Sequence, residues 1–274
     1  MHLWKRHNIF SLAAFLKNRK NPPTIVKKII LPLLAIAVFS TAFYPVFKAS
    51  HQKAAAAVTN MVSVSAHTAE AAGNKALSLS NQLYDSLKLS NLGLSEEALQ
   101  YAYKGYLNLV EKGQVKNPDV LTICDFSQPS NKKRMYILDV KNFKVLLNTY
   151  VAHGRNSGVT MAEHFSNNPE SLQSSLGFYV TKDTYKGKHG LSLRLDGQEH
   201  GFNDNAEARA VVVHGAQYIG DQRTGAGFMG RSFGCPAVPQ QLATTVINYI
   251  KGGTCLFIYH PSTAYLSGSK LINA

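Results

Sequence analysis

The sequence predicts a mainly β domain, of the β-sandwich or barrel type, with a helical N-terminal lead-in, one late helix and a preceding transmembrane helix. Three observations support this prediction. Short β-rich runs separated by turn residues extend from residue 120 to residue 259. Only one or two helical patterns accompany them, which favours a sandwich or barrel over a doubly wound sheet. An uncharged apolar run of nineteen residues lies near the N-terminus, about the length that crosses a bilayer as a helix.

Composition and charge indicate a folded protein with an unusual N-terminus. The 274 residues are 45% hydrophobic and 16% charged, which excludes a disordered chain. The net charge is +13, but nine basic residues and no acidic residue precede residue 70. The remainder is only mildly basic, so the excess is interpreted as a topology signal for export. Basic and aromatic residues do not cluster beyond the leader, and we expect no nucleic-acid partner.

The first 79 residues divide into three segments. Residues 1–28 form a basic leader that we expect to stay in the cytoplasm, because Lys27 and Lys28 directly precede the apolar run. Residues 29–47 form the predicted transmembrane helix, and a cleaved signal peptide is the open alternative. Residues 48–79 are rich in Ala, Ser and Thr and predict a linker.

A helical lead-in is predicted over residues 80–116. Ser95 supplies an N-cap hydroxyl, and Glu96 and Glu97 place negative charge in the first turn. Helical spacing of apolar residues continues to Lys112, and Gly113 ends the helix. A shorter helix is expected before it, over residues 79–89.

The β-rich body is predicted over residues 117–262, followed by a tail over 263–274. A late helix should start at Pro239 and run to about Ile250, with Gly252 after its end. The expected strands are 120–126, 134–140, 144–151, 176–181, 191–195, 210–213 and 254–259.

The three cysteines occupy different settings. Cys124 and Cys255 lie in predicted strands, where they are either two buried free thiols, the favoured interpretation, or a disulfide if the strands are neighbours in an exported protein. Cys235 lies among Gly, Ser and Pro in a loop. It is the cysteine placed for chemistry.

His214 and Cys235 together indicate a thiol nucleophile beside its base. His214 ends a buried strand, and a Gly-rich loop leads from it to Cys235. A histidine, the helix after Pro239 and Arg231 are each able to lower the pKa of the thiol. Gly234 permits a tight turn that frees backbone N–H groups for an oxyanion. These features suit acyl transfer through a thioester.

The other histidines predict no metal site. His153 follows a strand in a Gly/Asn/Ser loop and should border the cleft. The spacing of His153, His189, His200 and His214 is irregular, so we expect neither a metal nor another cofactor.

The motifs VVVHG at 211–215 and GRSFGCPAVP at 230–239 resemble the L,D-transpeptidase catalytic domain, the YkuD-like family. The likeness is greatest to the murein L,D-transpeptidase branch and extends over about residues 80–262. It includes DFSQPS at 125–130, VAHGRNSG at 151–158, SSLGFYVT at 174–181 and LRLDG at 193–197.

The resemblance implies a role for each site residue. Cys235 would be the nucleophile and His214 the general base. Gly234, Ser232 and Gly215 would shape the site and its oxyanion hole. From the residues themselves and not from the resemblance, Arg231, Phe233 and His153 are the expected substrate-binding residues. Two positions depart from the family: many relatives have a histidine where Phe233 stands, and an arginine or asparagine soon after the cysteine, where this chain has Pro236-Ala237-Val238.

The implied reaction is acyl transfer from a peptidoglycan stem tetrapeptide, with release of D-Ala and transfer to an amine. The acceptor is a second stem peptide or a protein amine. With water as the acceptor, the protein would be an L,D-carboxypeptidase or another thiol hydrolase. A non-catalytic cell-wall-binding protein is the second alternative. The expected location is the periplasm, with residues 29–47 in the inner membrane.

Overall fold

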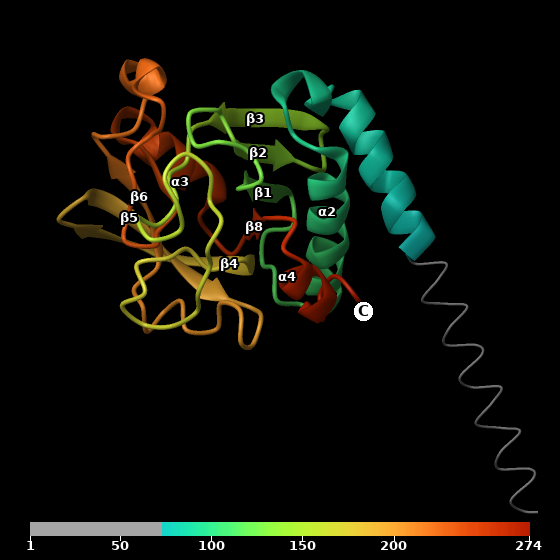
Figure 1. The fold of residues 1–274 in the computed structure, drawn as a ribbon. Coiled ribbons are helices and arrows are strands. Elements are labelled where there is room, and N and C mark those ends of the chain that lie inside the picture. Colours follow the sequence, from blue (N-terminus) through green and yellow to red (C-terminus); the bar gives the residue numbers. More distant parts are fainter. Residues whose placement is uncertain (1–72) are drawn as a thin grey trace, which may run out of the picture. The chain divides into compact units, whose positions relative to one another are not determined.

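The computed structural model of the protein describes residues 73–274, which lie within a single unit of the chain (Figure 1). The predicted leader, the predicted transmembrane helix over 29–47 and most of the predicted linker lie outside these residues. Within residues 73–274, no helix has both the length and the apolar character needed to cross a bilayer.

The described residues form one eight-stranded mixed sheet, which confirms the mainly β prediction. The strand order is β3-β2-β1-β8-β4-β5-β6-β7. The pairs β1–β8 and β6–β7 are parallel and the others antiparallel. The strands are β1 (Val120–Asp125), β2 (Met135–Asp139), β3 (Lys144–Thr149), β4 (Gly177–Gly187), β5 (Gly190–Gly197), β6 (Val212–Ala216), β7 (Ala237–Pro239) and β8 (Cys255–Tyr259).

The two ends of the sheet curl towards each other. The chain that leaves β3 forms an antiparallel bridge from Ala152 to Ala237 of β7, with an N–O distance of 2.8 Å. A second bridge joins Gly154 to Ser232. The sheet therefore nearly closes, and the closure positions the loop that contains Cys235.

Helix α2 (Glu96–Glu111) starts where the sequence predicts. The Ser95 hydroxyl accepts a hydrogen bond from the amide of Ala98 at 3.2 Å, which satisfies one free donor of the first turn. The helix packs on β1 and β8, and Gly105 permits the close approach: a Cβ there would lie 2.1 Å from the Phe178 ring. Before it, residues 73–86 are helical and Leu89–Leu92 form the 3₁₀ helix η2, so the first helix includes part of the predicted linker.

Helix α3 (Ala243–Ile250) starts four residues later than predicted. Pro239 has an extended backbone, with φ −53° and ψ 133°, and ends β7 instead of starting the helix. The 3₁₀ turn η4 (Gln240–Leu242) connects the two. With only three residues, β7 has no detectable alternation, which explains why no strand was expected there.

The expected tail is an integral part of the fold. It contains helix α4 (Thr263–Gly268) and the buried residues Tyr265, Leu271 and Ile272. The buried carboxylate of Glu199 accepts hydrogen bonds from the Tyr265 hydroxyl at 2.7 Å, from the Phe178 amide at 2.8 Å and from the Ser269 hydroxyl. These bonds tie the C-terminal segment to the sheet.

The β4–β5 hairpin is longer than predicted. The two strands continue to a pairing of Gly187 with Gly190, so Lys188 and His189 form a two-residue turn. A register shift between Thr181 and Thr184 and the exposure of the outer residues obscure the alternation that identifies strands.

Cys124 and Cys255 are buried free thiols, as favoured from the sequence. Their strands are neighbours, but Leu121 pairs with Cys255 and Cys124 with Ile258. A stagger of three residues corresponds to about 10 Å along the strands, beyond the reach of roughly 7 Å between the Cα atoms of a disulfide.

Candidate active site

His214 and Cys235 line the same pocket, which has a volume of about 430 Å³. Strand β6 contains His214, and its parallel pairing with β7 places His214 opposite Ala237. Cys235 is two residues before Ala237, so the pairing of two short strands brings together residues far apart in sequence. The pair predicted from the sequence therefore lies in one hollow of the structure.

His214 has the hydrogen bonding of a neutral base. Its Nδ1 lies 2.9 Å from the carbonyl oxygen of Gly215. A carbonyl only accepts, so we assign the proton to Nδ1 and the free lone pair to Nε2. Burial lowers the pKa of His214 below its usual range; the Gly215 carbonyl opposes this, and His189 and Lys188 add to it. The ring is therefore unprotonated at neutral pH.

Cys235 rests as a thiol. Its Sγ accepts from the Val212 amide at 3.5 Å and donates to the carbonyl of Ala210 at 3.7 Å. Burial raises the pKa of Cys235, and the Val212 amide and Arg209 oppose that rise. The sequence suggested Arg231 and the helix N-terminus as activating groups, but Arg209 is the arginine that acts here, and α3 starts eight residues after the cysteine.

The loop before Cys235 is held by Ser232. Its hydroxyl donates to the Cys235 carbonyl at 2.6 Å and accepts from the Gly234 amide at 3.1 Å. Gly234 has φ +126°, and a Cβ there would lie 2.8 Å from the Gln173 carbonyl. Only glycine fits this turn without strain.

The backbone amides of Gly234 and Cys235 differ in their availability to an oxyanion. The amide of Gly234 is bonded to Ser232 and is not free for substrate. The amide of Cys235 opposes the rise in the pKa of its own thiol. Of these two amides, the Cys235 N–H is the candidate donor to an oxyanion. Gly215 contributes to the site through its lack of a side chain. A Cβ at this position would lie only 2.8 Å from the Gln240 side chain, which would have to move.

The pocket lining is cationic. It includes Lys188, Arg209 and Arg231 and no carboxylate. The Arg209 guanidinium is occupied by hydrogen bonds within the protein. It donates to the Ser166 and Gln173 carbonyls, at 2.7 and 2.6 Å. It also donates to the hydroxyls of Ser175 and Ser171.

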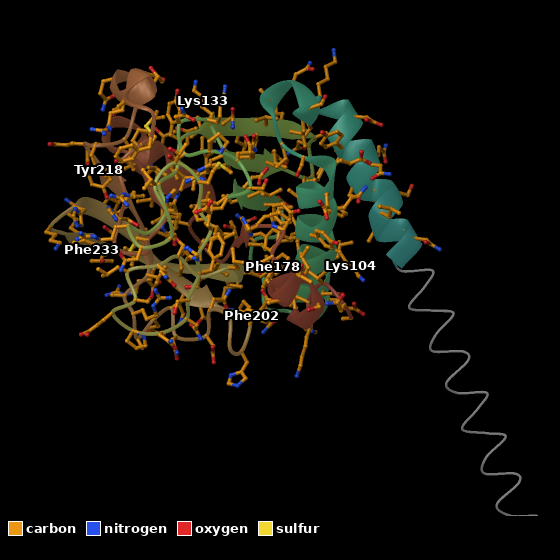
Figure 2. The ribbon with its side chains drawn as sticks, viewed as in Figure 1. Lys104, Lys133, Phe178, Phe202, Tyr218 and Phe233 are labelled. Atoms are coloured by element: carbon orange, nitrogen blue, oxygen red, sulfur yellow. The ribbon has the colours of Figure 1, made fainter. Side chains whose placement is uncertain are left out.

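Arg231 and Phe233 lie at the rim, where the sequence placed substrate binding. One guanidinium nitrogen of Arg231 donates to the carbonyls of Arg155 and Gly158, at 2.9 and 3.2 Å. Phe233 is 66% exposed, and the Arg155 guanidinium lies 5.9 Å from its ring centre. Phe233 and Tyr218 lie on the same side of the molecule, away from Phe178 and α2 (Figure 2).

His153 does not border the pocket, contrary to the expectation from its loop. It is fully buried, and its Nδ1 accepts from Arg134 at 2.8 Å while its Nε2 donates to the Gly158 carbonyl at 3.2 Å. Burial lowers its pKa to about 4, and Arg134 contributes further. His153 is a framework residue with no nitrogen left for a ligand, and this corrects its assignment to substrate binding.

Several pocket residues carry no recognisable sequence signal. They include His189, whose ring stacks on that of His214 with 4.5 Å between centres. The glycines flanking Lys188-His189 indicate a turn, but a turn does not identify which strand it will cover. The other lining residues without such a signal are Tyr185, Lys188 and Tyr218.

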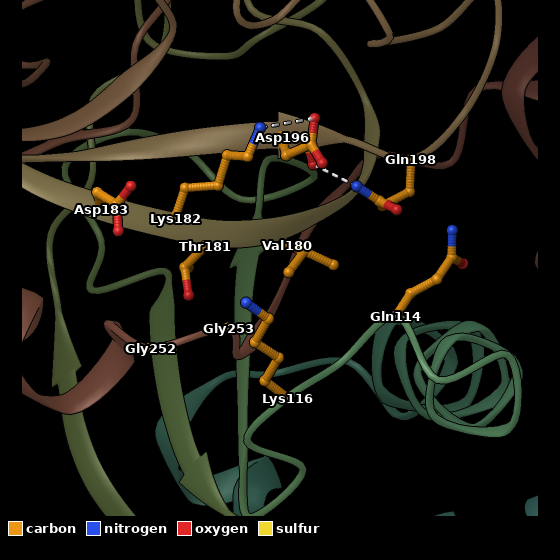
Figure 3. Close-up of a pocket in the computed structure, with 10 residues that line it drawn as sticks. All are labelled: Gln114, Lys116, Val180, Thr181, Lys182, Asp183, Asp196, Gln198, Gly252 and Gly253. Atoms are coloured by element: carbon orange, nitrogen blue, oxygen red, sulfur yellow. Dashed lines mark hydrogen bonds and ion pairs between the residues drawn. The ribbon is translucent and has the colours of Figure 1, made fainter.

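A second pocket of about 420 Å³ lies beside the bulged part of the β4–β5 pair (Figure 3). Its side chains include Lys116, Lys182 and Asp196, with Lys182 and Asp196 paired at 3.8 Å. It contains no cysteine or histidine. Within residues 73–274 no cluster of His, Cys, Asp or Glu has metal-binding geometry. The chemistry of acyl transfer is thus available in the His214–Cys235 pocket.

Comparison with known proteins places these features in a family. The model of the L,D-transpeptidase catalytic domain matches residues 90–259. No curated protein sequence is measurably similar to the chain.

Three solved structures illustrate the likeness. An L,D-transpeptidase from Mycobacterium smegmatis is 13% identical with a TM-score of 0.32, and the match covers 52% of this chain and 59% of that one. An L,D-transpeptidase in complex with imipenem is 12% identical with a TM-score of 0.32 and the same coverage. A mutant L,D-transpeptidase from Enterococcus faecium is 16% identical with a TM-score of 0.30, over 52% and 50%. The chain thus spans less than two thirds of each.

Proposed function

The chain belongs to the L,D-transpeptidase catalytic-domain family, and from this premise we propose that it is a peptidoglycan L,D-transpeptidase with Cys235 as nucleophile and His214 as general base. The observation that supports this most directly is the shared pocket, which is lined by both a thiol and an imidazole of defined tautomer. A thiol and a base within one cleft are the minimum for covalent acyl transfer.

The proposed reaction has two steps. His214 Nε2 takes the thiol proton as Cys235 Sγ attacks the carbonyl carbon of the third stem residue, a diamino acid. The amide bond to the terminal D-Ala breaks, and the departing amine receives the proton from His214. In the second step an acceptor amine attacks the thioester carbonyl and gives its proton to His214. The sulfur leaves and recovers that proton, which regenerates the resting pair.

The charge of the pocket favours an anionic peptide. A stem tetrapeptide ends in a carboxylate, and the lining offers Lys188 and Arg231 with donors not fully used within residues 73–274. Arg209, by contrast, is occupied by the scaffold. We therefore assign carboxylate recognition to Arg231 and Lys188, with Phe233 as an apolar contact at the rim.

Two measurements on the detergent-solubilised full chain test the proposal. Intact-protein mass spectrometry after incubation with imipenem should show one acyl adduct on Cys235, absent in Cys235→Ala and slowed in His214→Gln. Incubation with a disaccharide tetrapeptide should then yield a cross-linked dimer with loss of D-Ala. Tripeptide alone would indicate a carboxypeptidase. An unmodified Cys235 with no turnover would leave the cell-wall-binding alternative.

The exported location belongs to the same proposal and rests on the sequence of residues 1–47. A basic leader followed by an uncharged run of nineteen residues favours a cytoplasmic N-terminus and an exported domain. Fractionation tests this: the full chain should sediment with membranes and resist carbonate extraction, and added protease should digest the domain in spheroplasts. Recovery in the cytosolic fraction would contradict it.

A further inference from the structure

We propose that His189 is a positioning residue for His214: its ring covers one face of the base and fixes the orientation from which the base reaches Cys235. The inference rests on the proposed function, because it assigns His189 a role in that same site. Nothing in the sequence motifs marks this residue. Its role follows from the arrangement of three neighbouring strands.

The hairpin geometry brings His189 over the base. His189 is the second residue of the two-residue turn between β4 and β5, and Gly190 beside it has φ +80°. Strand β5 then pairs with β6 so that Ser192 lies opposite His214. The turn is thus only three residues from the partner of His214, and the hairpin folds its tip onto the neighbouring strand.

Two contacts together define the orientation of the His214 ring. The hydrogen bond from Nδ1 to the Gly215 carbonyl, at 2.9 Å, fixes the rotation of the ring in its plane. The His189 ring lies against its face, with 4.5 Å between centres and 28° between planes. Removing the second contact leaves the ring able to tilt, and misplacement of a catalytic group by even 1 Å lowers rates strongly.

His189 also separates the base from solvent. His214 is only 5% exposed, whereas His189 is exposed. His189 lines the pocket that contains Cys235 and also the adjoining pocket, of about 470 Å³, that contains Gly215 and Gln240. His189 is therefore shared by the two pockets, and it lies beside His214 where they adjoin.

The electrostatic surroundings of His214 agree with this placement. His189 and Lys188 both lower the pKa of His214, in addition to the effect of burial. Loss of the His189 imidazole should therefore let His214 take up a proton at higher pH. The other titratable or charged groups that line the pocket are Tyr185, Arg209, Tyr218, Arg231 and Cys235.

Three variants of the full chain separate the ring contact from the electrostatic effect. His189→Ala removes both the ring contact and the electrostatic effect of the imidazole on His214, whereas His189→Phe keeps an aromatic face without that effect. His200→Ala is the matched control, because His200 is exposed, pairs with Asp204 and does not line the pocket. The readout is the rate of Cys235 alkylation by iodoacetamide between pH 5 and pH 9, with thermal melts to confirm folding. Alkylation needs only the thiol and its base, so it remains informative even if the protein is not a transpeptidase.

We expect His189→Ala to slow alkylation at neutral pH by roughly tenfold, a fraction of the 10²–10⁴ that a positioned base contributes. His189→Phe should recover most of that loss. In both His189 variants, the low-pH part of the curve of alkylation rate against pH should move to higher pH, because His214 takes up its proton at higher pH. His200→Ala should match the wild type. Wild-type rates and an unshifted low-pH part of the curve in both His189 variants would overturn the inference, and so would equal slowing of the Ala and Phe variants.

Discussion

The Ser232 hydroxyl donates a hydrogen bond of 2.6 Å to the carbonyl oxygen of Cys235. Ser232 Oγ also accepts a hydrogen bond from the Gly234 amide, so one side chain holds the peptide groups of both Gly234 and Cys235. The conformation of this loop thus depends on a residue that does not itself react.

Ser232→Ala should lower kcat by about 10- to 100-fold with a smaller change in KM. The substitution leaves the buried Gly234 amide without its acceptor and frees the Cys235 peptide to shift. Steady-state kinetics on the disaccharide tetrapeptide measure this. Ser267→Ala is the control, because that hydroxyl bonds the Thr263 carbonyl on α4. An unchanged kcat in Ser232→Ala would show that the bond does not position the nucleophile.

Only one thiol should react in the folded protein. Cys124 and Cys255 are completely buried, and burial raises the pKa of Cys124 to about 12 and raises that of Cys255 strongly. Titration with a chromophoric disulfide reagent should therefore count one thiol under native conditions and three in denaturant. Cys235→Ala should reduce the native count to zero. A native count above one would contradict the burial of the strand cysteines.

The resting pair should titrate as a neutral thiol and a neutral imidazole. Burial raises the pKa of Cys235 and lowers that of His214. Thiolate absorbance near 240 nm should therefore be absent at pH 7 and appear only as the pH rises above the ordinary range for cysteine, about 8.5. Cys235→Ala supplies the baseline. Thiolate absorbance at pH 6 would instead indicate a preformed thiolate–imidazolium pair.

Two arginines of the pocket should give opposite phenotypes. Arg231→Gln should raise KM roughly tenfold with kcat nearly unchanged, because it removes a charge at the rim that binds substrate before and during reaction. Arg209→Gln should instead lower the free energy of unfolding by about 2–4 kcal/mol, because its guanidinium makes four hydrogen bonds to the 166–175 segment. Denaturant unfolding and steady-state kinetics on both variants distinguish the roles. A large stability loss in Arg231→Gln would reverse the assignment.

Glu199 should make stability fall as pH rises. Desolvation raises its pKa in the folded state, so the folded protein binds the proton more tightly than the unfolded chain does. The stabilisation is complete below the unfolded pKa of about 4.3 and is lost as pH rises through the higher folded value. Glu199→Gln should remove this slope between pH 4 and pH 7 and be at least as stable as the wild type at pH 7.

Glu199→Ala is the contrasting variant. It leaves the Phe178 amide and the hydroxyls of Tyr265 and Ser269 without their acceptor. Each such buried group costs about 1–3 kcal/mol, so we expect a loss of several kcal/mol at every pH. If Glu199→Gln were as destabilised as Glu199→Ala, the negative charge itself would be required.

Features with a local physical cause were predictable from the sequence. The Ser95 cap and the acidic first turn determine where α2 begins, and the run at 120–125 is β-rich over its whole length. The motif that contains His214 and Cys235 predicted that the two residues share a site. Each of them has a glycine as a neighbour, Gly215 and Gly234, and a glycine leaves space beside the reactive side chain.

Features that depend on pairing between distant segments were not predictable. Strand β7 exists because β6 and the chain after β3 supply its partners. The burial of His153 depends on Arg134, which directly precedes β2 and lies nineteen residues earlier in the chain. His189 lies on the base through the β5–β6 register, and Arg209 is bound by a segment more than thirty residues earlier in the chain. None of these contacts has a signature in local periodicity.

The bridge between Ala152 and Ala237 also bears on how the protein meets other polypeptides. An unpaired strand edge is a template for strand addition by another polypeptide, and long apolar edges promote aggregation. Strand β7 has only three residues, and Ala152 occupies its outer side. The bridge therefore covers part of the strand edge beside Cys235, which leaves less of that edge open to β-pairing with another polypeptide.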